Sequence, residues 1–133
     1  MKIGVVVADF NKDMTHVMLQ LVSDKAKGDH HEVVVAHVAG VYDMPVVVKK
    51  LLEQVDGVIT LGVVLQGGTD HDLTVANNAA QKFVDLSCDS GKPVACGVIG
   101  PRVSREKALE RVESYALHSY DALVQSLNTL RGL

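Results

Sequence analysis

Hydrophobic residues along this chain alternate between two patterns, one typical of strands and one typical of helices. Short runs dominated by Val, Ile and Leu occupy residues 3–8, 32–38, 58–65 and 94–99. Each run is short for a helix and largely apolar on both faces, which is typical of strands in a parallel sheet that is covered on both sides. We therefore expect four parallel strands.

Between and after these runs, apolar residues recur at spacings of three and four, the period of one helix face. This spacing predicts helices over residues 11–26, over residues 46–55 opened by Met44-Pro45, over residues 70–88, and after Ser104 as the N-cap of a long last helix. The residues predicted to face the core are Met14, Val17, Met18, Leu21 and Val22; Leu73, Ala76, Asn77, Ala80 and Val84; and Leu109, Val112, Ala116, Leu123, Leu127 and Leu130.

The strict alternation of strands and helices determines the expected fold. Strand–helix–strand units connect parallel strands by right-handed crossovers and place helices on both faces of the sheet. We therefore expect residues 1–133 to form a single α/β domain, a three-layer αβα sandwich with a four-stranded parallel sheet and the flavodoxin-like order βαβαβαβα. Such folds bind ligands beyond the carboxyl ends of their strands, so the four loops that follow the strands are the places to look for chemistry.

Composition and charge narrow the classes of partner. The formal net charge is −3, the pI is about 6.0, and no basic stretch is present, so we expect no nucleic-acid partner. No apolar run approaches the ~18 residues of a membrane span and no targeting signal begins the chain, so we expect a cytoplasmic protein without a membrane partner. Cys88 and Cys96 are too few and too widely spaced for a structural zinc site or a CxxC motif, and we interpret both as reduced packing residues.

The loop after the third predicted strand carries the strongest chemical signal. Gly67-Gly68-Thr69 precedes a helix, whose free N–H groups and positive dipole end favour an anion, although the pattern is not a P-loop. The structural alternative is that Thr69 caps this helix, with Asp72 as a capping-box partner. His71 falls in the first helical turn, where the dipole favours the neutral imidazole that a general base needs, and the alternative is an ordinary solvent-facing histidine.

The other three loops offer weaker signals. Phe10 is an aromatic residue between polar neighbours, where it either stacks on a planar ligand or packs on Met14 as a hydrophobic staple. Asp43 either accepts hydrogen bonds from ligand hydroxyls or caps the following helix. A phosphate would need a charged partner, for which the candidates are Arg102, Arg105 and Arg111. The remaining histidines show no spacing typical of a metal site, so no metal is expected.

Taken together, the loop sequences resemble the lumazine synthases of riboflavin biosynthesis. The residues that carry the resemblance are "FN" at residues 10–11, "GVYDMP" at 40–45, "LGVVLQGGTDHD" at 61–72 and "GVIGP" at 97–101, followed by "ALERV". They span essentially the whole chain, and the short length and the GVYDMP form look most like the archaeal branch. The combination is specific, whereas no single segment would be.

The resemblance implies roles for individual residues. Substrate contacts are implied for Phe10 and Asn11 at the pyrimidine ring, for Val41, Tyr42 and Asp43 along the ribityl chain, and for Val63, Val64 and Leu65 at the pyrimidine edge. Gly68, Thr69 and Arg111 are implied as phosphate ligands, and His71 as the proton-transfer residue. Cys96 stands where many members have an aromatic near the ring. Tyr115 and Ser119 stand where bacterial members often have lysines, so phosphate binding would depend more on Arg111.

The resemblance also implies a reaction and an assembly. The expected reaction condenses 5-amino-6-(D-ribitylamino)uracil with 3,4-dihydroxy-2-butanone 4-phosphate to 6,7-dimethyl-8-ribityllumazine and releases phosphate and water. It requires no metal and no other cofactor, so the expected partners are small-molecule substrates and further copies of the chain. Family members form pentamers, or assemblies of pentamers, with sites between subunits.

Two other functions fit the same fold class. An archaeal-type riboflavin synthase, a paralogue that dismutates two lumazine molecules, would not need the phosphate site that Gly68, Thr69 and Arg111 suggest. A non-enzymatic flavin-binding module of flavodoxin-like architecture would need a phosphate loop with several Ser or Thr residues after the first strand. The segment Asp9-Phe10-Asn11-Lys12 does not supply one.

Overall fold

The computed structural model describes all 133 residues and confirms the expected order of elements. The elements are β1 Lys2–Ala8, α1 Lys12–Gly28, β2 Glu32–Val38, a short 3₁₀ helix η1 Val41–Asp43, α2 Met44–Leu51, β3 Gly57–Val63, α3 His71–Ser90, β4 Val94–Ile99 and α4 Arg105–Arg131. Ser104 caps α4 as expected, because its hydroxyl accepts a hydrogen bond from the Lys107 amide at 3.2 Å.

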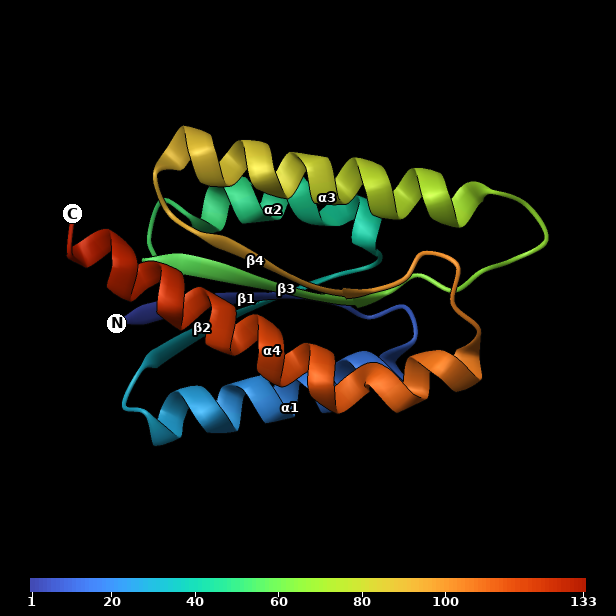
Figure 1. The fold of residues 1–133 in the computed structure, drawn as a ribbon, viewed down its shortest axis with the longest axis horizontal. Helices are drawn as coiled ribbons and strands as arrows, with labels where there is room; N and C mark the ends of the chain where they lie inside the picture. The colour runs from blue at the N-terminus through green and yellow to red at the C-terminus, as the bar shows by residue number, and fades with distance from the viewer.

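The strands form one parallel sheet in the order β2-β1-β3-β4. Helices α2 and α3 cover one face and helices α1 and α4 cover the other, so the three-layer α/β sandwich is confirmed (Figure 1). The chain leaves β1 toward β2 on one side and later returns to β3 on the other side. The boundary between β1 and β3 is therefore the topological switch point, where α/β folds of this kind bind ligands.

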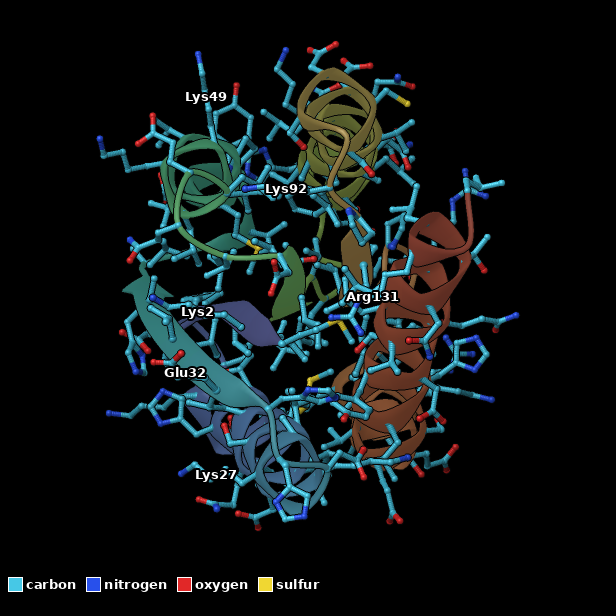
Figure 2. All side chains as sticks on the ribbon, turned by 90° about the vertical axis from the view of Figure 1, so that its left-hand side faces the viewer. Lys2, Lys27, Glu32, Lys49, Lys92 and Arg131 are labelled. Carbon is cyan, nitrogen blue, oxygen red and sulfur yellow. The ribbon has the colours of Figure 1, made fainter.

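Two apolar cores fill the space between the layers. One joins α1 and α4 to the sheet with 18 buried residues, and the other joins α2 and α3 to the opposite face with 15. All seven residues of the central strand β3 are buried, whereas the edge strand β2 has exposed residues along its length. The amino ends of the strands lie at the end of the molecule that faces the viewer in Figure 2, where Lys2, Glu32 and Lys92 are labelled. The candidate loops lie at the opposite end.

Two elements end earlier than the sequence predicts. Helix α2 ends at Leu51 rather than at residue 55, because the amides of residues 52–54 close turns onto the carbonyls of Val48, Lys50 and Leu51. Leu52 and Val55 nevertheless remain buried, so the apolar pattern was correct while the helical geometry was not. Strand β3 ends at Val63, two residues earlier than expected.

The buried faces of three helices also differ from the expectation. On α3, Val84 is exposed and the buried stripe runs through Ala76, Ala79 and Phe83. Leu109 and Leu130 on α4 are 51% and 46% exposed, and Val17 on α1 is 48% exposed. These helices carry apolar residues on more than one face, and the period alone does not determine which face meets the sheet.

The two cysteines are free thiols, but neither is a core residue. Cys88 and Cys96 both lie at the surface of the chain, which corrects the expectation that they serve packing. No helix is long and apolar enough to cross a membrane.

Candidate active site

The loops after β1 and β3 are joined at the switch point. Asn11 adopts a left-handed backbone conformation, with φ 63°, and its side-chain amide donates a hydrogen bond to the carbonyl oxygen of Val63 at 3.1 Å. Asparagine tolerates this conformation better than most residues. This hydrogen bond holds the end of β1 against the end of β3. It uses a backbone group of Val63, a residue for which the resemblance implies a contact with the pyrimidine edge.

Phe10 projects from this junction into solvent. The ladder between β1 and β2 continues past the strands, because the amides of Asp9 and Phe10 donate to the carbonyls of Val38 and Ala39 at 2.8 and 2.9 Å. The backbone of Phe10 is therefore fixed, while the residue is 73% exposed. Met14 lies in the core with no exposed surface, so the exposed Phe10 ring does not form the hydrophobic staple of the alternative interpretation.

The loop after β2 combines one buried residue with two exposed ones. Val41 is 4% exposed and packs against β3, where a Cβ added to Gly62 would lie 2.5 Å from Val41 Cγ2. Tyr42 is 65% exposed, and Asp43 is exposed as well. The Asp43 carboxylate accepts a hydrogen bond from the Gly40 amide at 3.1 Å, so the capping role is present. The bond uses Oδ2 and leaves Oδ1 for another donor.

The loop after β3 is exposed in its middle and anchored at both ends. At the first end, the Val64 amide donates to the Ile99 carbonyl and the Gln66 amide donates to the Val103 carbonyl, each at 2.8 Å. At the second end, the Asp72 carboxylate accepts a hydrogen bond from the Arg102 amide at 2.8 Å. The partners in these bonds, Ile99, Arg102 and Val103, lie at the end of β4 or between β4 and α4. This segment therefore determines the path of the loop.

The anchored loop leaves its polar groups free. Every residue from 67 to 71 is exposed, and no heavy atom lies within 4 Å of a Cβ built on Gly67 or Gly68. The Thr69 hydroxyl accepts a hydrogen bond from the His71 amide at 3.3 Å, just ahead of α3. The capping box of the structural alternative is absent, because Asp72 is 5% exposed and is bonded to Arg102 instead of the loop backbone. Nothing in the sequence pairs Asp72 with an amide 30 residues away.

The three residues for which the resemblance implies contact with the pyrimidine edge differ in how their backbone groups are used. Val63 uses its carbonyl for Asn11 and Val64 uses its amide for Ile99. Leu65 is half-buried, and its backbone amide and carbonyl have no partner within the chain. Among the three, Leu65 therefore has the backbone groups best suited to an external hydrogen-bond partner.

A second group of expected site residues lies on β4 and α4. Cys96 borders an open hollow of about 420 Å³ whose other lining residues come from α4: Ser114, Tyr115, His118 and Ser119. Although Cys96 is exposed in the single chain, the surrounding protein desolvates its thiol enough to raise the pKa, so the thiol stays protonated near neutrality. Arg111 is exposed one helical turn before Tyr115, and among the arginine candidates Arg105 is already paired with Asp13.

The chain is similar over its length to proteins of known function. The family model described as 6,7-dimethyl-8-ribityllumazine synthase matches residues 1–131. Lumazine synthases of Pyrobaculum arsenaticum and Pyrobaculum calidifontis are 49% and 50% identical over 127 residues, which cover 93% of this chain and 85% of each relative. The lumazine synthase of Saccharolobus solfataricus is 44% identical over 135 residues, covering 99% of this chain and 88% of the relative.

These similarities distinguish between the functions that the fold allows. Each match extends over nearly the full length of the chain, and the family match over residues 1–131 includes all four loops at the carboxyl edge. They favour the lumazine synthases over the riboflavin synthase paralogue and over a non-enzymatic flavin-binding module. The chain belongs to the 6,7-dimethyl-8-ribityllumazine synthase family.

Proposed function

We propose that this chain condenses 5-amino-6-(D-ribitylamino)uracil with 3,4-dihydroxy-2-butanone 4-phosphate at the carboxyl edge of its sheet. The full-length family match carries the assignment of the reaction. The amine attacks the ketone carbonyl and forms a Schiff base with loss of water. Phosphate then leaves, the ring closes and a second water is lost. Holding two substrates in reacting geometry supplies much of the rate acceleration in such a condensation.

The exposed loop at residues 67–71 binds the phosphate in this proposal. Gly67 and Gly68 place no side chain over their amides, and the amino end of α3 adds its positive dipole end. Thr69 uses its hydroxyl oxygen as an acceptor for the His71 amide, so the hydroxyl proton remains available for a phosphate oxygen. The anchors at Gln66 and Asp72 hold the loop before the ligand arrives.

His71 transfers protons between the condensing groups. It is the first residue of α3, it is exposed, and it is two residues from Thr69. A phosphate held by the loop therefore brings the carbons of the butanone toward this imidazole. An imidazole can accept a proton at one ring nitrogen and donate one from the other, which suits a sequence in which protons are both removed and returned.

The pyrimidine and its ribityl chain occupy the loops nearer the switch point. The exposed Phe10 ring stacks on the planar pyrimidine, and the free backbone groups of Leu65 bond to its edge. Asp43 accepts hydrogen bonds from ribityl hydroxyls through the oxygen that Gly40 does not use. Asn11 acts indirectly, because its bond to Val63 fixes the junction that presents Phe10.

The site is completed by a second copy of the chain. The residues assigned to it form two groups, one on the loops after β1, β2 and β3, and one on β4 and α4. Cys96 and Arg111 belong to the second group, whose hollow is open to solvent and lined by α4. In a ring of subunits such as a pentamer, the β4–α4 group of one chain can face the loops of its neighbour, so that Arg111 reaches the phosphate across the interface.

The reaction is tested by mixing the purified protein with both substrates and following the absorbance of the lumazine product. Product formation well above the uncatalysed background is expected. A rate equal to background contradicts the proposal, and consumption of added lumazine would indicate the paralogous reaction instead.

Sharing of the site between subunits is tested by complementation. Arg111→Ala and His71→Ala variants are each assayed alone, and then after the two are unfolded and refolded together. Random mixing leaves about a quarter of the interfaces with both native residues, so activity should recover to about that fraction of the unmodified protein. Mixed samples no more active than the separate variants would place both residues within one chain's site.

A further inference from the structure

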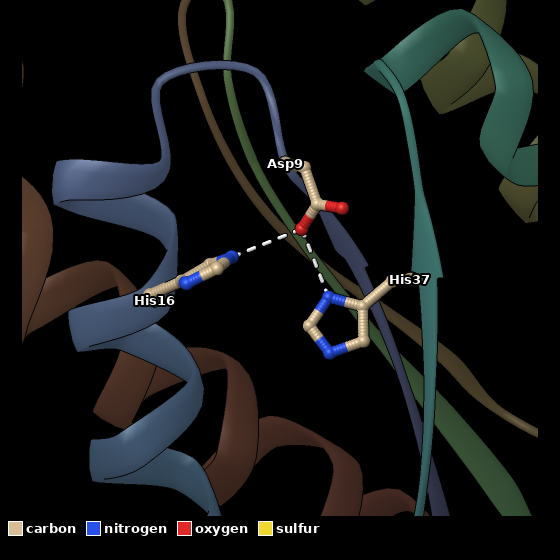
Figure 3. A group of neighbouring side chains, drawn as sticks. All are labelled: Asp9, His16 and His37. Carbon is tan, nitrogen blue, oxygen red and sulfur yellow. Dashed lines mark hydrogen bonds and ion pairs between the residues drawn. The ribbon is translucent and has the colours of Figure 1, made fainter.

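Two histidines and an aspartate converge at the exit of β1, outside the groups assigned to the reaction (Figure 3). His16 Nε2 and His37 Nδ1 each lie 2.9 Å from the same oxygen of Asp9, Oδ1. The two imidazole rings meet edge to face, with their centroids 5.6 Å apart and an interplanar angle of 74°. The three side chains come from three parts of the chain: Asp9 directly follows β1, His16 lies on helix α1 and His37 lies on strand β2.

The fold explains why these side chains meet. His37 is the register partner of Val7 across β1 and β2, and Val7 belongs to the core on the α1 side of the sheet. Side chains of a strand alternate between faces, so Asp9, two residues after Val7, points to that same side. His16 lies on the first turns of α1, which covers this face. Backbone pairing and helix packing therefore hold all three groups near one point.

The chemistry and spacing of the three groups suit a metal ion. Imidazole nitrogens and a carboxylate oxygen are typical ligands of zinc and other first-row divalent ions. The three ligand atoms lie within 4.8 Å of one another. A tetrahedral ion with bonds of about 2.0–2.1 Å holds neighbouring ligand atoms about 3.3 Å apart. The cluster therefore needs only small side-chain rotations to surround an ion.

The cluster is also open to solvent. An exposed aspartate is ionised at neutral pH, and a neutral imidazole can present an unprotonated ring nitrogen to an ion by changing tautomer. The side chains are 48%, 45% and 48% exposed for Asp9, His16 and His37, which leaves room for water as a further ligand. Asp9 Oδ2 accepts no hydrogen bond within the chain and is free to coordinate as well.

We propose that Asp9, His16 and His37 form a binding site for a divalent transition-metal cation, with zinc as the reference ion and water completing its coordination. Sequence spacing gave no reason to expect this site, because the two histidines lie on different elements. The ion would join β1, α1 and β2 immediately beside Phe10 and Asn11. Its role is to stabilise this corner of the sheet, and it takes no part in the condensation.

Metal binding is measured on protein that has been stripped with a chelator and dialysed. Zinc titration by calorimetry should give one ion per chain with micromolar affinity, and cobalt should give the visible absorption of a low-symmetry site. His16→Gln and His37→Gln should each weaken zinc binding at least ~10-fold, which is the lower end of the loss seen when mere outer-shell partners are removed. The matched control is His30→Asn, because His30 lies outside the cluster in a left-handed conformation that asparagine tolerates.

Thermal unfolding with and without zinc distinguishes a variant that has lost a zinc-binding side chain from one that has misfolded. Zinc binding to the native state should raise the midpoint of thermal unfolding in the unmodified protein and in the His30→Asn control. Both cluster variants should keep the metal-free midpoint of the parent and lose the zinc-dependent rise. Absence of stoichiometric binding to the unmodified protein overturns the proposal, as does unchanged zinc affinity in both cluster variants. Either result would leave the three groups as a hydrogen-bonded cluster only.

Discussion

The glycines around the end of β3 fall into two kinds. Gly62, inside the strand, and Gly100, after β4, are glycines because there is no room for a side chain. A Cβ on Gly62 would lie 2.5 Å from Val41, and a Cβ on Gly100 would overlap the Val64 carbonyl. Gly100 also has φ +107°. Gly67 and Gly68, in the loop, have no heavy atom within 4 Å of an added Cβ and are not in the left-handed region.

The two kinds of glycine have different explanations: one kind is required by the fold, and the other is proposed to serve a ligand. Gly62 and Gly100 are explained by packing and backbone geometry within the chain. The packing of a single chain does not explain Gly67 and Gly68, although glycine raises the conformational entropy that folding must overcome. In the proposed site, close approach of a phosphate to the backbone gives these two loop positions a reason to be glycine. Four predictions test this separation, from the largest expected effect to the smallest.

The largest effect is expected from Gly100→Ala. Overpacking against Val64 and a left-handed alanine together should lower the free energy of unfolding by roughly 2–5 kcal/mol. Urea unfolding at one fixed protein concentration measures it. Gly28→Ala is the control, since nothing lies within 4 Å of its added Cβ, and it should change stability by less than about 1 kcal/mol. If Gly100→Ala and Gly28→Ala were equally stable, packing would not be the reason for glycine at position 100.

His71→Asn should reduce turnover about 100-fold, the lower range for loss of a general acid–base group. Because His71 is exposed, its replacement should change the free energy of unfolding by no more than about 0.5 kcal/mol. Steady-state kinetics with both substrates measures the turnover, with His30→Asn as the matched control. If both histidine variants turn over at the parent rate, the proton-transfer role belongs to another group.

Asp72→Ala should lower the free energy of unfolding by roughly 1.5–3 kcal/mol, because it removes a buried carboxylate and leaves the Arg102 amide without its charged acceptor. The same change releases one end of the phosphate loop, so KM for the butanone phosphate should rise. Chemical unfolding and steady-state kinetics on one preparation measure both. A loss of stability with unchanged KM would show that the loop keeps its path without this anchor.

The smallest effect is expected from Thr69→Ala. It removes the hydroxyl that accepts the His71 amide, a bond worth about 1 kcal/mol or less at this exposed position. Thr69→Ser keeps the hydroxyl and should match the parent in chemical unfolding. If Thr69→Ala were as destabilising as Asp72→Ala, the loop would be organised by its own turn rather than by its two anchors.

Much of the architecture could be predicted from the sequence, since runs of Val and Ile separated by helical periods determine a parallel α/β sheet. The ends of elements were harder. Strand β3 ends at Val63 because its ladder with β4 stops there: the Val64 amide bonds to Ile99, and the backbone groups of Leu65 have no partner in the chain. The buried face of α3 was misplaced because two apolar stripes compete, and only contact with the sheet selects the one containing Phe83.

The candidate site was predictable in its residue types and less so in its contacts. Gly68, Thr69 and His71 stand out because an exposed glycine pair beside a helix start has few structural uses. The bonds from Asn11 to Val63 and from Arg102 to Asp72 depend on the order of the strands and on loop conformation, which no spacing reports. For the same reason the cluster of Asp9, His16 and His37 became visible only when β1, α1 and β2 were placed together.

Inhibition by inorganic phosphate tests most directly whether the exposed glycines serve the ligand. Phosphate should compete with the butanone phosphate, and its inhibition constant should rise about 10-fold in Gly68→Ala, which corresponds to loss of roughly 1.4 kcal/mol of binding. The stability of this variant should match that of Gly28→Ala, whose inhibition constant should equal the parent's. An unchanged inhibition constant in Gly68→Ala, or inhibition that does not compete with the butanone phosphate, would contradict the assignment of the loop at residues 67–71 to the phosphate.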